Sequence, residues 1–309
     1  MPIVNTKVPV TSELNQRYLQ QIAEKYPFTK LEQVGTTDFQ RPIWMLTIGT
    51  GERHVLFTAA HHANEWITTL VLLQYAEDLA EAIQKGGILF GQRAVEMAEA
   101  VTIHLIPMVN PDGVDLVTGA IGQGSPQYVL AEGLAQNYPA IPFPDGWKAN
   151  LSGVDLNLNY PAGWLQAREI KFSQGYTRPG PRDYVGRAPL DQPETRALAD
   201  LTEKLDPELV LAYHSQGKEI YWQFRDCFVP GSRELGEVMA RVSGYALADT
   251  PYESSFAGYK DWFIQNFRRP GYTVEVGSGE NPLPLRQFPE IYRDNVPLLN
   301  IAAIGINNS

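Results

Sequence analysis

The sequence predicts an α/β sandwich in which helices cover both faces of a mixed, mostly parallel central β-sheet. Short apolar runs of strand length alternate with longer segments whose apolar residues repeat at helical spacing, and turn-forming residues separate the two. With 44% hydrophobic and 19% charged residues, the chain of 309 residues can bury a large core. No linker-like stretch divides it, so we expect one domain over residues 1–309.

The first predicted element is a helix that follows the capping residue Thr11 and ends before Pro27. Five apolar runs have the length of buried strands, at residues 43–48, 55–58, 101–106, 209–212 and 272–276. Helical spacing predicts three further helices, at residues 67–82, 194–205 and 233–242. Residues 119–147 are rich in Gly, Pro, Gln and Asn, which predicts a long irregular loop.

Charge and cysteine usage exclude several classes of protein. The formal net charge is -10, and no basic run could neutralise a phosphate backbone, so nucleic acid is not an expected partner. Cys227 is the only cysteine, which rules out an intrachain disulfide. The sequence shows neither a signal peptide nor a long apolar span, so we expect a cytoplasmic protein that does not enter membranes.

Two histidines and a glutamate form a candidate metal site. His62 and Glu65 lie where a predicted strand meets a helix, and their spacing lets both side chains reach one ion. His214 follows another predicted strand and is the third candidate ligand. This set is typical of catalytic zinc, since it leaves one coordination position for a water molecule. We therefore expect one zinc ion; the alternative is that these histidines are only hydrogen-bonded at strand ends.

A zinc-bound water requires a general base, and Glu275 is the candidate. It lies within the apolar run at residues 272–276, where a buried carboxylate is unfavourable unless it has a functional partner. The alternative is a glutamate on an edge strand that faces solvent. The remaining candidates, His61 and His104, are interpreted as structural residues.

The order of these motifs resembles the zinc metallocarboxypeptidases. The family pattern of His-x-x-Glu, a distant His-Ser and a late Glu is present, and so are segments similar to its Arg-Pro-Ile (41–43), Asn-Pro-Asp-Gly (110–113) and Gly-Val-Asp-x-Asn (153–157). The resemblance implies the carboxypeptidase fold and amide hydrolysis by an activated water, with Glu275 as the base. It also implies that Ser215 contacts substrate and that Lys148, at the position of a family arginine, stabilises the oxyanion. The alternative for Lys148 is a solvated loop lysine.

Two departures from the family pattern concern substrate recognition. Asn157 is present, but Leu158 replaces the arginine that would clamp a C-terminal carboxylate together with it, which argues against simple exopeptidase action. Lys260 falls at the position that sets side-chain preference in the primed-side pocket, which predicts an anionic group on the substrate.

A third departure concerns a catalytic tyrosine of the family. An ungapped match places Glu253 there, with Tyr252 or Tyr259 as possible substitutes. We expect Tyr259 to be among the substrate-binding residues.

The local strings around the metal ligands are most similar to the bacterial γ-D-glutamyl-L-diamino acid endopeptidase branch. That resemblance implies a peptide substrate derived from peptidoglycan, cleaved between D-glutamate and meso-diaminopimelate, and a bacterial source. Three alternatives stay open: a carboxypeptidase that releases acidic C-terminal residues, a zinc deacylase or amidase on the same fold, and an inactive binding module. The sequence does not indicate an oligomeric state.

Overall fold

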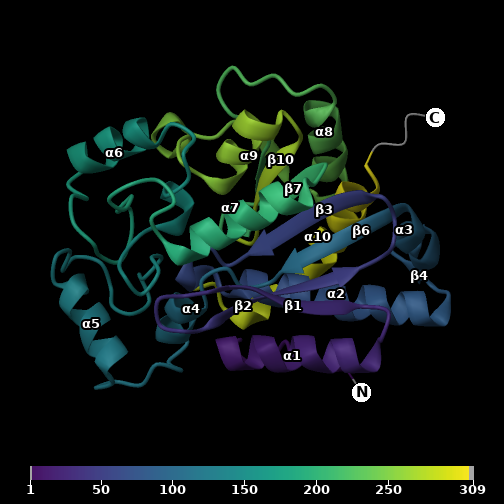
Figure 1. Cartoon of the computed structure of the whole chain (residues 1–309), viewed down its shortest axis with the longest axis horizontal. Coiled ribbons are helices and arrows are strands. Elements are labelled where there is room, and N and C mark those ends of the chain that lie inside the picture. Colours follow the sequence, from purple (N-terminus) through teal and green to yellow (C-terminus); the bar gives the residue numbers. More distant parts are fainter. Residues whose placement is uncertain (1, 306–309) are drawn as a thin grey trace.

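An eight-stranded mixed β-sheet runs through the molecule in the computed structural model, which describes residues 2–305 (Figure 1). Its strands, in spatial order, are β1 (Lys30–Thr36), β2 (Pro42–Ile48), β6 (Val101–Ile106), β3 (Arg53–Ala59), β7 (Leu209–His214), β10 (Gly271–Glu275), β8 (Glu219–Tyr221) and β9 (Ala246–Ala248). A separate hairpin consists of β4 (Ile88–Leu89) and β5 (Gln92–Arg93).

The centre of the sheet is parallel. Strands β6, β3, β7 and β10 all run in one direction, whereas β1 and β2 pair antiparallel, as do β2 with β6 and β10 with β8. Strands β8 and β9 are again parallel. The predicted mixed, mostly parallel α/β sandwich is thus confirmed.

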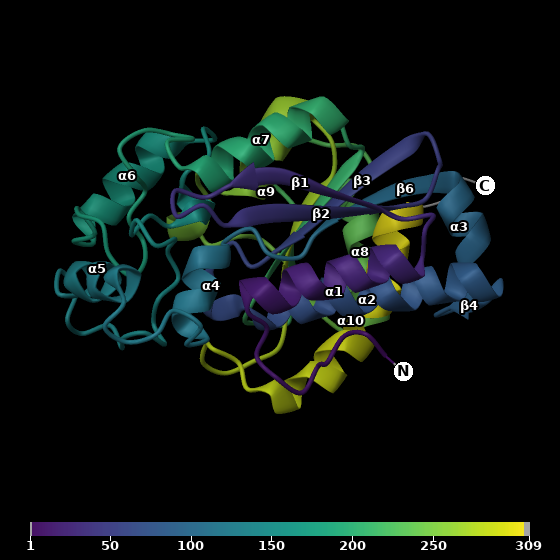
Figure 2. The same cartoon turned by 60° about the horizontal axis from the view of Figure 1, so that its bottom comes forward.

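Helices cover the sheet on both sides. Figure 2 shows α1, α2 and α10 below the sheet and α7 above it. The helices are α1 (Ser12–Lys25), α2 (Ile67–Lys85), α3 (Ala94–Ala100), α4 (Pro111–Val117), α5 (Pro126–Ala135), α6 (Trp164–Ser173), α7 (Pro193–Leu205), α8 (Ser232–Ser243), α9 (Tyr259–Phe267) and α10 (Phe288–Ile304). Short 3₁₀ turns are η1 (Ala63–Glu65), η2 (Leu156–Leu158), η3 (Tyr252–Ser254) and η4 (Leu285–Gln287).

Each central strand contributes to two cores, one on each face of the sheet. Phe57 of β3 and Leu211 of β7 pack in the core beneath α1, α2 and α10, while their neighbours Leu56 and Val210 pack in the core with α7 and α9. This alternation follows from the two-residue period of a strand. Because both faces are buried, the strands read as continuous apolar runs rather than alternating ones.

The prediction of an irregular loop over residues 119–147 is wrong in its middle. Ser125 caps helix α5 by accepting a hydrogen bond from the Tyr128 backbone N–H, and Pro126 occupies the first turn. These are ordinary start signals of a helix, but Val129 and Leu130 lie exposed on α5, so apolar periodicity is weak there. Among residues 2–305, no helix combines the length and apolar character needed to cross a bilayer.

Candidate active site

The candidate site lies where the central parallel strands end. Strands β3, β7 and β10 are neighbours with the same direction, so their carboxyl ends lie at one edge of the sheet. His214 ends β7, Glu275 ends β10, and the two residues are register partners. His62 follows β3 closely and precedes the 3₁₀ turn that carries Glu65.

His62, Glu65 and His214 converge as a buried cluster, which we call the metal group. One ligand atom from each lies within 4.8 Å of the others. The Nδ1 atoms of His62 and His214 are 3.1 Å apart. Glu65 Oε1 lies 2.9 Å from Nδ1 of His62, and Glu65 Oε2 lies 2.9 Å from Nδ1 of His214. The turn that presents Glu65 is fixed because the Thr68 hydroxyl donates to the Glu65 carbonyl at 2.7 Å and accepts from the Ala60 N–H at 3.1 Å.

This arrangement fits a zinc ion. Two imidazole nitrogens that face each other at 3.1 Å cannot both carry protons, so at least one presents a free lone pair. Ligand bonds of about 2.0–2.1 Å in a tetrahedral site place donor atoms about 3.3 Å apart, close to the separations seen here. Burial alone would raise the pKa of Glu65, but His62, Lys148 and His214 hold it well below its ordinary value. Glu65 is thus kept as a carboxylate, the form that ligates metal.

Asp155 orients the His62 ring from behind. Its Oδ1 atom lies 3.0 Å from His62 Nε2, which leaves Nδ1 to face the metal group. Asp155 also accepts backbone N–H groups of Asn157 at 3.2 Å and Asp183 at 3.3 Å. In the sequence, Asp155 is part of the Gly-Val-Asp-x-Asn segment, and nothing local to that segment predicts its contact with His62.

Glu275 and Lys148 border the metal group. Strand β10 has β7 on one side and β8 on the other, so Glu275 is not on an edge strand. Burial and the nearby Glu65 raise the pKa of Glu275 to about 8. The Lys148 Nζ atom lies 3.3 Å from Glu65 Oε1 and its side chain is 19% exposed, which does not match a freely solvated loop lysine. Although burial opposes it, Glu65 and Asp155 raise the pKa of Lys148, which therefore stays cationic.

Two cavities meet at this group. The first, of about 190 Å³, is lined by Asn157 and Lys260, for which the resemblance to the family implies a place on the leaving-group side. The Lys260 Nζ atom lies 2.6 Å from Asp261 Oδ1 and donates to the Gln223 carbonyl at 2.6 Å. The Asn157 side-chain oxygen accepts the backbone N–H of Tyr259 at 3.0 Å.

The second cavity, of about 760 Å³, is lined by Glu65, whereas the first is lined by His62 and His214. Ser215 also lines the second cavity, donating its hydroxyl hydrogen to Asn281 Oδ1 at 2.8 Å and its backbone N–H to Glu65 Oε2 at 3.2 Å. Four residues line both cavities and so mark the junction between them: Lys148, Arg182, Tyr221 and Glu275.

Comparison with known proteins identifies the family. A family model described as zinc carboxypeptidase matches residues 15–297. The chain belongs to the zinc carboxypeptidase family. It is 42% identical over 278 residues to "Gamma-D-glutamyl-L-diamino acid endopeptidase 1" from Lysinibacillus sphaericus, covering 89% of this chain and 67% of that protein. It is therefore a zinc metallopeptidase, close in sequence to an enzyme named for cleavage at a diamino acid.

Two solved structures have the same fold as this chain, although their sequence identity to it is low. Carboxypeptidase A from Helicoverpa armigera superimposes with a TM-score of 0.71 at 18% identity, over 99% of this chain and 76% of that one. A murein-tripeptide amidase from Escherichia coli O157 gives a TM-score of 0.56 at 20% identity, over 88% and 91% of the two chains. These likenesses establish the carboxypeptidase fold.

The structure does not bring Tyr259 to either cavity. Its side chain is fully buried in the core on the α7 side, and its hydroxyl lies 2.8 Å from the Thr202 hydroxyl. Tyr252 and Glu253 lie on η3 and line neither cavity. Tyr221 of β8 is the tyrosine at the junction, where its hydroxyl donates to Glu219 at 2.6 Å. Sequence reasoning missed it, because only the pairing of β8 with β10 brings it there.

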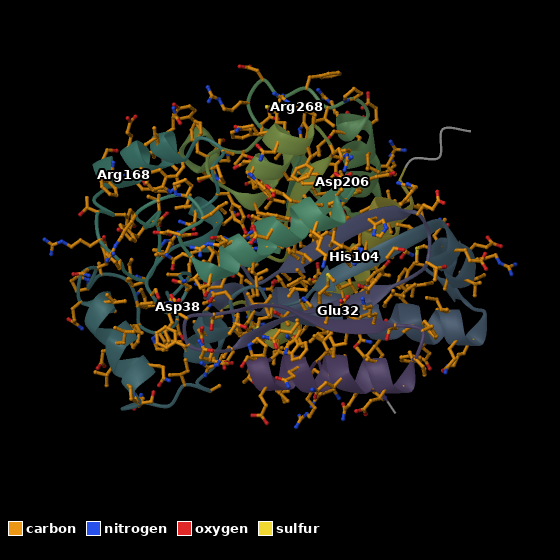
Figure 3. The ribbon with its side chains drawn as sticks, viewed as in Figure 1. Glu32, Asp38, His104, Arg168, Asp206 and Arg268 are labelled. Atoms are coloured by element: carbon orange, nitrogen blue, oxygen red, sulfur yellow. The ribbon has the colours of Figure 1, made fainter. Side chains whose placement is uncertain are left out.

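The two remaining histidines of interest lie outside the ligand group. His61 Nε2 lies 3.3 Å from the Tyr160 hydroxyl. His104 is on β6, where its ring nitrogens bind Thr47 and His54, and Figure 3 shows it on the sheet beside Glu32. Burial and the adjacent His54 lower the pKa of His104 to about 4.

Proposed function

We propose that this zinc metallopeptidase hydrolyses the bond between the γ-carboxyl of D-glutamate and meso-diaminopimelate in peptidoglycan-derived peptides. The observation that carries the proposal is the 42% identity, over 89% of this chain, to a γ-D-glutamyl-L-diamino acid endopeptidase. Lys260 in the lining of the smaller cavity supports it, because diaminopimelate carries an additional carboxylate at its far centre. Lys260 would pair with that carboxylate, and a peptide held in this way does not need the arginine that Leu158 replaces.

His62, Glu65 and His214 would hold one zinc ion. When bound, the ion would polarise the scissile carbonyl and acidify the attacking water. Glu275 would take the proton of that water as its oxygen adds to the γ-carbonyl carbon, and would deliver a proton to the amine nitrogen as the C–N bond breaks. Lys148 would donate a hydrogen bond to the developing oxyanion. Burial raises the pKa of Glu275, which makes its carboxylate a stronger base than that of an exposed glutamate.

The second candidate function is a carboxypeptidase that releases acidic C-terminal residues. It is favoured by Lys260 and Asn157, which line the same cavity. It lacks a counterpart to the family arginine, since Leu158 follows Asn157. A deacylase on this fold has no comparable supporting observation.

Product analysis by mass spectrometry distinguishes these functions. Zinc-loaded protein is incubated with L-Ala-γ-D-Glu-meso-diaminopimelate and, separately, with ordinary peptides that have free acidic C-termini. We expect release of L-Ala-D-Glu and diaminopimelate, abolished by a chelator. Release of single C-terminal residues from the ordinary peptides, with the first peptide left intact, would contradict the proposal and establish the carboxypeptidase alternative.

A further inference from the structure

We propose that Arg182 binds the free α-carboxylate of the γ-linked D-glutamate, on the acyl side of the scissile bond, and so selects γ-glutamyl substrates whose α-carboxyl is ionised. This inference rests on the proposed function and adds a second recognition point to it. Lys260 reads the leaving group, whereas Arg182 would read the residue that retains the new carboxyl group after hydrolysis.

Arg182 stands at the junction of the two cavities. The smaller one holds the leaving-group residues Asn157 and Lys260, so the larger one, which is lined by the metal-group residue Glu65, is left for the acyl part of the substrate. Arg182 lines both, as do Lys148 and Glu275. A substrate whose scissile carbonyl lies between Lys148 and Glu275 therefore passes the Arg182 side chain.

The backbone around Arg182 is fixed to the catalytic group on both sides. The Pro181 carbonyl accepts the backbone N–H groups of Lys148 at 2.8 Å and Ala149 at 2.9 Å. The Asp183 N–H donates to Asp155 Oδ2 at 3.3 Å, and the same Asp155 orients His62. Arg182 is thus held between the segment of the oxyanion lysine and the segment that supports a metal ligand, a preorganised position for substrate recognition.

Arg182 also retains charge and donors for a ligand. Its Nε atom donates to Asp183 Oδ2 at 2.7 Å, and within residues 2–305 no hydrogen bond involves its two terminal nitrogens. Asp183 is shared, since Lys171 Nζ lies 2.7 Å from its other oxygen, so one carboxylate faces two cations. With its side chain 41% exposed and its terminal nitrogens free of hydrogen bonds within residues 2–305, Arg182 can bind a substrate anion without displacing an existing partner.

The chemistry of a γ-glutamyl bond supplies the matching anion. When glutamate is linked through its side-chain carboxyl, its α-carboxyl is free and lies a short aliphatic chain away from the scissile carbonyl. Among α-linked residues, only glutamate carries a carboxylate at the same distance along the chain, and its amino group lies next to the scissile carbonyl rather than next to that carboxylate. A planar guanidinium with two unused nitrogens binds a carboxylate through two parallel hydrogen bonds, a geometry that an ammonium cannot reproduce.

A matched pair of substrates tests the inference. One is L-Ala-γ-D-Glu-meso-diaminopimelate, and the other is the same peptide with the glutamate α-carboxyl converted to a carboxamide. We expect wild-type kcat/KM to be about 10- to 100-fold higher for the carboxylate peptide, as for a hydrogen-bonded charge pair. Arg182→Gln should lose about that factor on the carboxylate peptide and less than threefold on the carboxamide, so that the preference disappears. Arg182→Lys should retain part of it.

The controls separate recognition from folding. Arg178→Ala removes an exposed arginine of the same loop that lines neither cavity, and it should leave both kcat/KM values unchanged. The loop should tolerate loss of Arg182, because Asp183 keeps Lys171 as its partner; equal thermal unfolding midpoints for wild type and Arg182→Gln would verify this.

Each outcome bears on one of the two proposals. Equal losses on both peptides in Arg182→Gln, or a wild-type enzyme indifferent to the α-carboxylate, would overturn the role of Arg182 while the proposed function stands. Failure of the wild-type enzyme to cleave either peptide, with ordinary C-terminal peptides still hydrolysed, would overturn the proposed function and this inference with it.

Discussion

His62 is constrained at both ring nitrogens, and this determines which of them can ligate a metal. Nε2 lies 3.0 Å from Asp155, while Nδ1 faces Glu65 and His214. Because the imidazole has one proton when neutral, the contact with Asp155 places that proton on Nε2 and leaves the Nδ1 lone pair free. Asp155 is thus a positioning residue for the metal site.

Asp155→Ala should weaken zinc affinity by about 10- to 100-fold, the usual effect of losing the carboxylate behind a ligating histidine. Titration with zinc against a competing chelator measures the change. Asp226→Ala, at an exposed aspartate that lines neither cavity, is the control and should bind zinc as the wild type does. Unchanged affinity in Asp155→Ala would contradict the positioning role.

Glu275→Gln should retain zinc and lose about 100- to 10,000-fold in kcat, the usual contribution of a general base. The amide has the shape of the carboxylate but cannot accept the proton of the attacking water. Metal content and turnover are measured on the same preparation. Activity within about tenfold of wild type would show that another residue is the base.

At the scale of elements, the carboxyl ends of β3, β7 and β10 bring the candidate catalytic residues together, and helix α7 supports the neighbouring loops. Glu194, in the first turn of α7, is buried and accepts hydrogen bonds from Asn150 Nδ2 at 3.2 and 3.4 Å. A helix N-terminus favours a carboxylate, but burial outweighs this and raises the pKa of Glu194 to about 8. The side chain is therefore protonated in the folded protein at neutral pH.

Glu194 makes stability decrease as pH rises. Between its ordinary pKa of 4.5 and the folded value of about 8, the unfolded chain has released this proton and the folded chain has not. The free energy of unfolding therefore falls through that window, by on the order of 5 kcal/mol if this group acts alone. Glu194→Gln should remove the dependence, so its unfolding midpoint should rise relative to wild type between pH 5 and pH 8.5. An offset that is the same at both pH values would contradict the assignment.

At the scale of the whole molecule, the metal group joins segments that are distant in the chain. His62 and Glu65 follow β3, whereas His214 ends β7, and both strands lie in the centre of the sheet. An ion that binds all three residues would stabilise the folded state, because the unfolded chain cannot present them together.

Removal of zinc should lower the thermal unfolding midpoint, and re-addition should restore it at a stoichiometry of one ion per chain. Calorimetry together with elemental analysis measures both quantities. A midpoint that is independent of zinc would argue against a site built from both strands, and a stoichiometry of two would contradict the single-ion proposal.

The sequence by itself determined the alternation of strands and helices, the candidate metal ligands and the chemical class of the enzyme. These features are local: a buried strand is a run of apolar residues, and His62 and Glu65 are close in the chain. The tertiary structure alone decided which distant side chains meet. It placed Arg182 and Tyr221 at the junction of the cavities, Asp155 behind His62, and Tyr259 in the core. Such contacts depend on strand order and loop packing, which no short segment of sequence encodes.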